Sequence, residues 1–219
     1  MKKRIFSIVV MFGVTLLFLF NNPTAYAAEI STGDIHIDEE YLIPDSFDWC
    51  TYYILVATNN TGKDIYVSAD FAAIDANGNV VAKVNDYAEA VKKGQQFILY
   101  GQFKNTEIKN AVKYQYVFNQ AETDNCTYNS VNIDAVKIGN CVQVSATNYS
   151  SKDIQGVGVR TIFLKNGKAV AFDTVNIADV GYVFHGGSTN SQVVGYSAGS
   201  FDEYIMTYTS AGNVEVVDF

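Results

Sequence analysis

Apolar and polar residues alternate along much of the chain, and this period of two predicts β-strands with one buried face. The clearest case is the segment 65–75, IYVSADFAAID. Its apolar face would carry Ile65, Val67, Ala69, Phe71 and Ala73. The segments 50–59, 95–103 and 112–118 are rich in β-branched and aromatic residues and predict three more strands. Only residues 88–92 hint at a helix, so the pattern predicts an all-β protein.

The chain contains an internal duplication. The sequence ATNNTGKDI at 57–65 returns as ATNYSSKDI at 146–154, and an Asn-Gly pair at 77–78 returns at 166–167, each after 89 residues. Asn-Gly suits a hairpin turn because both residues tolerate positive φ. Solenoid repeats are only about 20–50 residues long, so this longer period predicts two tandem domains.

Short strands separated by polar turns predict two β-sandwiches, at 28–121 and 122–219. The order of a strand, an Asn-rich turn, a strand ending in Phe71-Ala72-Ala73-Ile74-Asp75 and then Asn-Gly resembles the FxLYD domain. That family is an immunoglobulin-like sandwich found in tandem in exported bacterial proteins. At the matching positions 160–164 of the second copy, both Phe and Asp are replaced. The resemblance implies two tandem immunoglobulin-like domains without catalytic residues.

The second copy departs from the first in the phase of its apolar residues. Its inward positions would hold two glycines and Arg160, whereas Val157, Val159 and Phe163 fall on the opposite face. A β-bulge at a glycine would shift the phase by one residue. Alternatively, the face that carries Arg160 is covered by the first domain or by a partner. The sequence leaves both explanations open.

The N-terminus has the three regions of a secretory signal peptide. A basic stretch at 2–4 precedes an apolar core at 5–20, and Ala25-Tyr26-Ala27 supplies the small-x-small cleavage pattern. The apolar core is short for a membrane-spanning helix, which needs about 20 residues. We therefore expect cleavage of residues 1–27 and a secreted or cell-surface protein without membrane insertion. A retained membrane anchor is the alternative.

The charge of the chain narrows its partners. The formal net charge is −8 at pH 7, and removal of the basic stretch at 2–4 makes the mature chain more negative still. Nucleic acids and anionic membranes favour clustered Lys and Arg, so we expect neither as a partner. A protein, a carbohydrate at the cell surface, or a second copy of the chain remains.

Three cysteines, Cys50, Cys126 and Cys141, lack the spacing of a zinc site or a thioredoxin-like motif. Outside the cytoplasm a pair of cysteines can stay oxidised. In a sandwich of the immunoglobulin type, we expect the second strand to start at the pole where the last strand ends. This topology favours a disulfide between Cys50 and Cys126, with three free thiols as the alternative.

Patterns for catalysis or metal binding are weak. Asp34, His36, Asp38 and Glu40 would project from one face of a strand, but such neighbours are about 7 Å apart, too far for easy chelation of one ion. The solvated face of an edge strand accounts for the same row. His185 has no Cys or acidic neighbour in the sequence, and no nucleophile elbow, P-loop or H-E-x-x-H motif occurs. We expect neither catalysis nor a cofactor.

Aromatic residues make up 14% of the chain and provide the remaining candidates for a site. Most would fill sandwich cores, but outward rings can stack on sugars or anchor a protein interface. Tyr66, Tyr100 and Tyr196 are the candidate binding residues. The sequence thus predicts a non-catalytic binding or adhesion module that recognises a protein or glycan at the cell envelope. The alternative is a structural or spacer protein that self-associates through strand edges.

Overall fold

The computed structural model describes residues 35–212, and its regular structure is almost entirely β. The predicted signal segment, 1–27, lies outside the described residues. The first half of the chain forms strands β1 (Ile35–Pro44), β2 (Cys50–Asn59), β3 (Ile65–Asp75), β4 (Val80–Val91), β5 (Gln96–Lys104) and β6 (Ala111–Glu122). Within residues 35–212, no helix has the length and apolar character needed to span a membrane.

The second half of the chain begins with a single 3-10 turn and continues in short strands. Its elements are η1 (Tyr128–Ser130), β7 (Val131–Ile138), β8 (Cys141–Asn148), β9 (Ile154–Gln155), β10 (Val157–Lys165), β11 (Lys168–Ile177), η2 (Val180–Tyr182), β12 (Val183–Phe184), β13 (Thr189–Val194) and β14 (Glu203–Thr209).

The strands predicted for the first copy are confirmed, and β2 and β3 have the predicted bounds. The alternation in β3 places its apolar face in a core, and the Asn-Gly pair at 77–78 forms the turn between β3 and β4. The hint of a helix at 88–92 is wrong. Ala88 lies in β4, where it pairs with Val67 and packs into the core, so sheet pairing overrides local propensity there.

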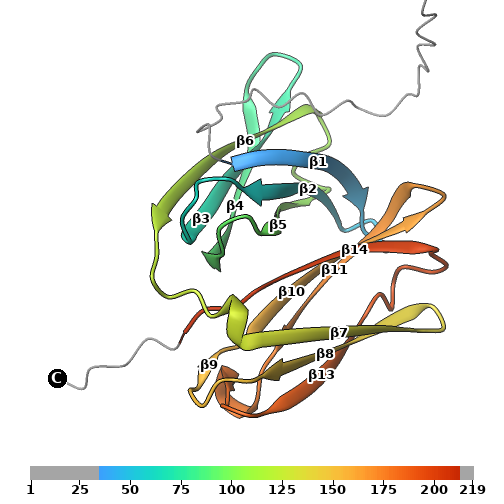
Figure 1. The fold of residues 1–219 in the computed structure, drawn as a ribbon. Helices are drawn as coiled ribbons and strands as arrows, with labels where there is room; N and C mark the ends of the chain where they lie inside the picture. The colour runs from blue at the N-terminus through green and yellow to red at the C-terminus, as the bar shows by residue number, and fades with distance from the viewer. Residues whose placement is uncertain (1–34, 213–219) are drawn as a thin grey trace, which may run out of the picture.

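Each half consists of two three-stranded antiparallel sheets. In the first half the strand orders are β1-β2-β5 and β4-β3-β6, and in the second half they are β13-β8-β7 and β11-β10-β14. The two halves correspond strand for strand, with β9 and β12 as an additional short pair. Both can be followed in Figure 1, where the blue-to-green half lies above the yellow-to-red half. The prediction of an all-β sandwich architecture is confirmed.

Three hydrophobic cores hold the sheets together. The first lies between the two sheets of the first half and includes Tyr53, Phe71 and Phe103. The second lies within the second half and includes Phe163 and Phe184. The third lies between the halves and combines buried residues from β1, β2, β5, β10 and β11, namely Ile43, Ile54, Val56, Ile98, Ile162 and Phe172.

The third core makes the molecule a stack of four sheets. The outer face of β1-β2-β5 packs on the outer face of β11-β10-β14, so these two sheets are covered on both sides. Their strands therefore contain unbroken buried runs, such as residues 53–57 in β2 and 161–164 in β10. Strand β8 lies in the middle of the outer sheet β13-β8-β7, and its residues instead alternate strictly between buried and half-exposed positions. Continuous apolar runs are typical of strands that are buried on both faces.

Both explanations for the phase shift of the second copy are correct. Gly156 interrupts the strand between β9 and β10, and after it Val157, Val159 and Phe163 point into the second core. The opposite face of β10, with Arg160 and Ile162, is covered by the first half. The break at Gly156 thus exchanges the two faces of the strand, and the exchanged face becomes part of the junction between the halves.

Candidate functional site

The repeated nine residues build the same buried network twice, beginning with Asn59 in the first half. Its side-chain amide donates hydrogen bonds to the carbonyl oxygens of Lys63, Val91 and Lys92 at 2.8, 3.1 and 3.1 Å. Its side-chain oxygen accepts hydrogen bonds from the backbone N–H and the hydroxyl of Thr61. The side chain thus joins the turn after β2 to the end of β4.

Asn148 repeats this arrangement in the second half. Its amide donates to the carbonyl oxygens of Lys152, Phe184 and His185 at 2.9, 3.1 and 3.2 Å, and its oxygen accepts from the backbone and hydroxyl of Ser150. Both asparagines are 0% exposed. Because every polar atom of each side chain is occupied by the protein's own backbone and neighbours, the duplicated motif is structural and has no group left for a ligand.

The histidine and carboxylate row at 34–40 does not form a metal site in the described part of the chain. Asp34 lies outside the described residues. A β-bulge between Ile37 and Glu39 breaks the alternation, so His36, Asp38 and Glu40 do not share one face as predicted. Glu40 instead accepts a hydrogen bond of 2.7 Å from the buried hydroxyl of Tyr53. Burial raises the pKa of Tyr53, and the nearby Glu40 carboxylate raises it further.

The second histidine does have an acidic partner, contrary to the sequence prediction. His185 Nδ1 lies 3.0 Å from a carboxylate oxygen of Asp153, a residue distant in sequence and adjacent in the fold. The backbone N–H of Gly186 binds the other oxygen at 3.1 Å. The Gly186 N–H and then His185 hold the pKa of Asp153 below its usual value. The equivalent Asp64 accepts from the N–H of Lys93, so this pairing fixes a turn.

The predicted Cys50–Cys126 disulfide is not supported. Cys50, Cys126 and Cys141 are all free thiols. β6 pairs antiparallel with β3 so that Glu122 lies opposite Ile65, which places the end of β6 at the pole where β2 ends. Cys50 lies at the start of β2, roughly 30 Å away along the strand. A disulfide needs Cα atoms within about 7 Å, so the expected pole was the wrong one.

The three predicted binding tyrosines have different surroundings. Tyr100 packs in the third core, with its ring 4.8 Å from that of Phe172, so it stabilises the junction between the halves. Tyr66 is 37% exposed and stacks on Tyr87 at 6.1 Å, on the open face of β4-β3-β6. Tyr196 is 78% exposed, in the segment after β13. The structure therefore does not bring these rings together into one site.

An aromatic loop between β1 and β2 was not predicted from the sequence. Phe47 and Trp49 are 72% and 76% exposed, and their ring centroids lie 5.7 Å apart. Asp45 holds the loop from below, because one carboxylate oxygen accepts the N–H groups of Phe47 at 3.1 Å and of Trp49 at 2.8 Å. Its other oxygen accepts the thiol of Cys50 at 3.4 Å. The sequence signal was a pair of large aromatic residues within a turn, where polar residues are usual.

The Asp45 carboxylate is stabilised in its charged form. Partial desolvation raises its pKa, but hydrogen bonds from Trp49, Cys50 and Phe47 outweigh this effect and the net shift is downward. Ionised Asp45 therefore keeps the loop ordered at neutral pH.

Two clefts flank the aromatic loop. One, of about 560 Å³, is lined by Trp49, Cys50, Tyr52 and Gln102 among others. The other, of about 360 Å³, runs between Phe47 and the start of β11 in the second half. Exposed Trp and Phe side chains beside two clefts form a surface that a partner could cover with a gain in hydrophobic free energy.

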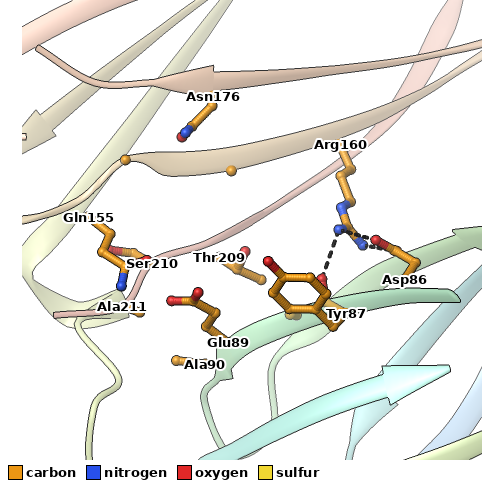
Figure 2. A pocket seen from close by; sticks show the side chains of 13 residues that line it. Asp86, Tyr87, Glu89, Ala90, Gln155, Arg160, Asn176, Thr209, Ser210 and Ala211 are labelled. Carbon is orange, nitrogen blue, oxygen red and sulfur yellow. Dashed lines mark hydrogen bonds and ion pairs between the residues drawn. The ribbon is translucent and has the colours of Figure 1, made fainter. Parts of the chain in front are cut away.

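An ion pair closes the junction on its other side. Arg160 of β10 binds both carboxylate oxygens of Asp86 of β4, at 2.6 and 2.9 Å, as Figure 2 shows. Its guanidinium also donates to the carbonyl oxygens of Ile98 and Tyr87, and it lies 5.1 Å from the ring centroid of Tyr100. Arg160 is therefore the side chain that the exchanged face of β10 places against the first half.

The pair also satisfies the open edge of β5. Asp86 accepts the backbone N–H of Tyr100 at 3.0 Å, while Arg160 donates to the carbonyl of Ile98 on the same strand. Unpaired backbone groups at a sheet edge would otherwise need water or another strand. Burial raises the pKa of Asp86 even though Arg160 lowers it. Because desolvation opposes the attraction, we expect the pair to contribute more to the orientation of the halves than to stability.

No protein-family model and no curated protein matches the chain. Many solved structures show a distant likeness, and three of them serve as examples. Red sea bream transglutaminase is 9% identical, with 78% of this chain and 29% of that chain covered and a TM-score of 0.25. The C-terminal globular domain of an oligosaccharyltransferase from Pyrococcus abyssi is 13% identical, with 82% and 47% covered and a TM-score of 0.28. A glycoside hydrolase family 2 β-glucuronidase is 14% identical, with 76% and 20% covered and a TM-score of 0.18. The chain spans less than half of each structure, and similarity at this level carries no argument about function.

Proposed function

We propose that the protein is an exported, non-catalytic binding module of the cell envelope. In this proposal residues 1–27 are a cleaved signal peptide, and 28–121 and 122–219 are tandem immunoglobulin-like domains related to the FxLYD family. The strand-for-strand correspondence of the two halves and their separate cores support the tandem arrangement. Phe71 and Asp75 of the resemblance also have clear structural roles, since Phe71 fills the first core and Asp75 binds the turn N–H groups of Asn77 and Asn79.

The observation that carries the proposal is the loop at 45–49. Large aromatic side chains exposed on a mobile loop would lose entropy on binding, but here Asp45 already holds the backbone of both Phe47 and Trp49. Trp is the residue most enriched among the side chains that dominate protein interfaces. A preorganised Phe–Trp pair therefore favours recognition.

The clefts beside the loop favour a protein as the partner. The larger one is lined by Trp49, Cys50 and Tyr52 and exposes more apolar than polar surface. Apolar side chains of a partner protein would fill such a cleft and bury the two rings. Its rim holds Asp48 and Lys104, which suits the polar rim of an interface.

The test is binding of the labelled protein to intact cells of the producing organism, before and after the cells are treated with protease. We expect saturable binding that protease abolishes and that the double variant Phe47→Ala/Trp49→Ala weakens at least about tenfold. Tyr149→Ala, which removes another exposed ring, is the matched control and should bind normally. Binding that survives protease, or that the double variant retains, would contradict a protein partner at this loop.

A structural or spacer role is the second candidate, and the third core favours it. This core packs the two sandwiches of residues 35–212 face to face, which suits a spacer. A protein that shows no cell binding but self-associates in analytical ultracentrifugation would support this alternative.

A further inference from the structure

A third cleft, separate from the two beside the aromatic loop, opens between β4 of the first half and the strands of the second half. It encloses about 360 Å³, within the range of small-ligand sites. Strand β4 of the first half forms one wall, and β9, β10, the end of β11 and the end of β14 form the other. Figure 2 shows the side chains of both halves facing this space.

Four polar side chains in this cleft have no hydrogen-bond partner among residues 35–212. Glu89 comes from the first half, and Gln155, Asn176 and Thr209 come from the second. In Figure 2 they lie around the open space between the two walls. Together they offer a carboxylate acceptor, two amides that donate and accept, and a hydroxyl. Their complementary groups must therefore come from water or from a ligand.

The backbone leaves room for one of these groups. Gly156 has no side chain, and a Cβ at that position would lie 2.3 Å from Oδ1 and 2.7 Å from Nδ2 of Asn176. The break between β9 and β10 thus falls at a glycine, whose absent side chain lets the Asn176 amide lie over the cleft wall. Any larger residue would displace that amide.

An aromatic ring borders the polar groups. Tyr87 lines the cleft and is 51% exposed, and its ring stacks on Tyr66 at an interplanar angle of 26°. The stacking restrains the Tyr87 ring, so little entropy remains to be lost when a ligand covers it. An aromatic face beside hydrogen-bonding groups suits a molecule that has one apolar face and several hydroxyl groups.

The charge of the cleft limits the ligand further. Asp86 binds Nη1 and Nη2 of Arg160, and two backbone carbonyls accept from the same two nitrogens, so four of the five guanidinium N–H donors are occupied and the positive charge is paired within the protein. Glu89 is then the one charged side chain of the lining without a partner among the described residues. A negative charge at the cleft disfavours acidic ligands such as uronic acids.

We propose that this cleft is a binding site for a neutral saccharide. One pyranose ring packs its C–H face on Tyr87, and its hydroxyl groups hydrogen-bond with Glu89, Gln155 and Asn176. Because both halves supply groups, the site exists only when the third core holds them together. The inference is independent of the aromatic loop and would stand if that loop bound nothing.

The experiment is a titration of the full mature protein, uniformly labelled with ¹⁵N, with neutral methyl hexopyranosides and their short oligosaccharides up to about 10 mM. Side-chain amide signals of Gln155 and Asn176 report binding inside the cleft. We expect these two signals to shift saturably with a neutral sugar and less with the matching uronate. Tyr87→Ala and Gly156→Val should each weaken binding at least about tenfold, a loss of 1.4 kcal/mol, whereas the control Tyr149→Ala should not.

Two outcomes would overturn the proposal. One is the absence of saturable shifts at the Gln155 and Asn176 amides with every neutral sugar. The other is binding that prefers the uronate or that persists unchanged in Glu89→Gln and Gly156→Val. Glu89→Gln alters a side chain without a partner in the described chain, so its fold should be intact and its result can be interpreted even if Gly156→Val unfolds. Neither outcome affects the cell-binding test of the aromatic loop.

Discussion

At the scale of single residues, two asparagines account for the duplicated sequence. The side-chain amides of Asn59 and Asn148 donate hydrogen bonds to several backbone carbonyls where a turn meets the end of a strand. No other side chain offers two donors and an acceptor with the same short geometry. The repeated residues thus serve the same purpose in both halves, which is to hydrogen-bond the backbone of the turn. At the position two residues after each asparagine, Thr61 and Ser150 both supply a hydroxyl and differ only by a methyl group.

Replacing Asn59 with Ala should lower the free energy of unfolding by roughly 2–4 kcal/mol, because carbonyl groups of Lys63, Val91 and Lys92 lose a buried donor. Urea denaturation measures the change. Asn60→Ala is the matched control. Asn60 is the next residue and is exposed, so its replacement should change the free energy of unfolding by less than about 0.5 kcal/mol. Equal effects of the two variants would show that the network is not needed.

Thr161 is the opposite case, a buried polar atom without a partner. Its side chain is fully buried, and its hydroxyl has no hydrogen bond among the described residues. Thr161→Val should raise the free energy of unfolding by about 1 kcal/mol, since it removes an unsatisfied hydroxyl at nearly constant shape. Thr51→Val, which deletes a hydroxyl that donates to Asn105 at 2.8 Å, should lower it. Thermal denaturation of both variants tests the pair, and the same sign for both would contradict the argument.

Among the strands, a one-residue irregularity decides which side chains lie on which face. The bulge next to Asp38 breaks up the carboxylate row in β1 and turns Glu40 toward Tyr53. Gly156 exchanges the two faces of β10 and delivers Arg160 to the junction. Because strand side chains alternate with a period of two, an irregularity of one residue is enough for either change.

The β1–β2 loop should lose its order in acid. The folded-state pKa of Asp45 lies below the unfolded value, so its contribution is present above about pH 3.9 and is lost as the pH falls through the folded value. Trp49 is the only tryptophan in the chain, so its fluorescence anisotropy reports the loop directly. We expect the anisotropy to fall in acid before the fold melts.

Asp45→Asn provides the control for this titration. The amide cannot ionise, so the variant should show the same loop signal at neutral and acidic pH. An unchanged acid transition in Asp45→Asn would show that Asp45 does not cause the loosening of the loop.

At the scale of the whole molecule, the third core converts two sandwiches into one stack of four sheets. Ile54, Ile98 and Phe172 bury the outer faces that would otherwise be exposed to water. The two clefts of the junction lie at opposite ends of β11, one beside Phe47 and the other beside Asn176. The relative position of the halves therefore sets the shape of both candidate sites.

Replacing one partner of the Arg160–Asp86 ion pair should destabilise the fold strongly, whereas replacing both partners should destabilise it much less. Arg160→Met leaves Asp86 largely buried without its guanidinium and should lower the free energy of unfolding by about 3–5 kcal/mol. The double variant Arg160→Met/Asp86→Asn should recover most of that loss, because no unpaired charge remains. Urea denaturation of the single and double variants measures the coupling.

The exposed ion pair of Lys63 and Glu122 is the control for these variants. Lys63→Met should lower the free energy of unfolding by at most about 1 kcal/mol. A double variant at the junction that is as unstable as Arg160→Met would refute the view that the ion pair mainly orients the halves.

The sequence by itself determined the strands, the hairpin at Asn77-Gly78 and the duplication, because strand periodicity and turn chemistry act within a few residues. Tertiary structure alone decided which faces are covered, where the cysteines lie and what Tyr100 does. Arg160 contacts Tyr100 and Asp86, which precede it by 60 and 74 positions in the sequence. Local patterns do not record such contacts, so the polar cleft between the halves emerged only from the packing of one half on the other.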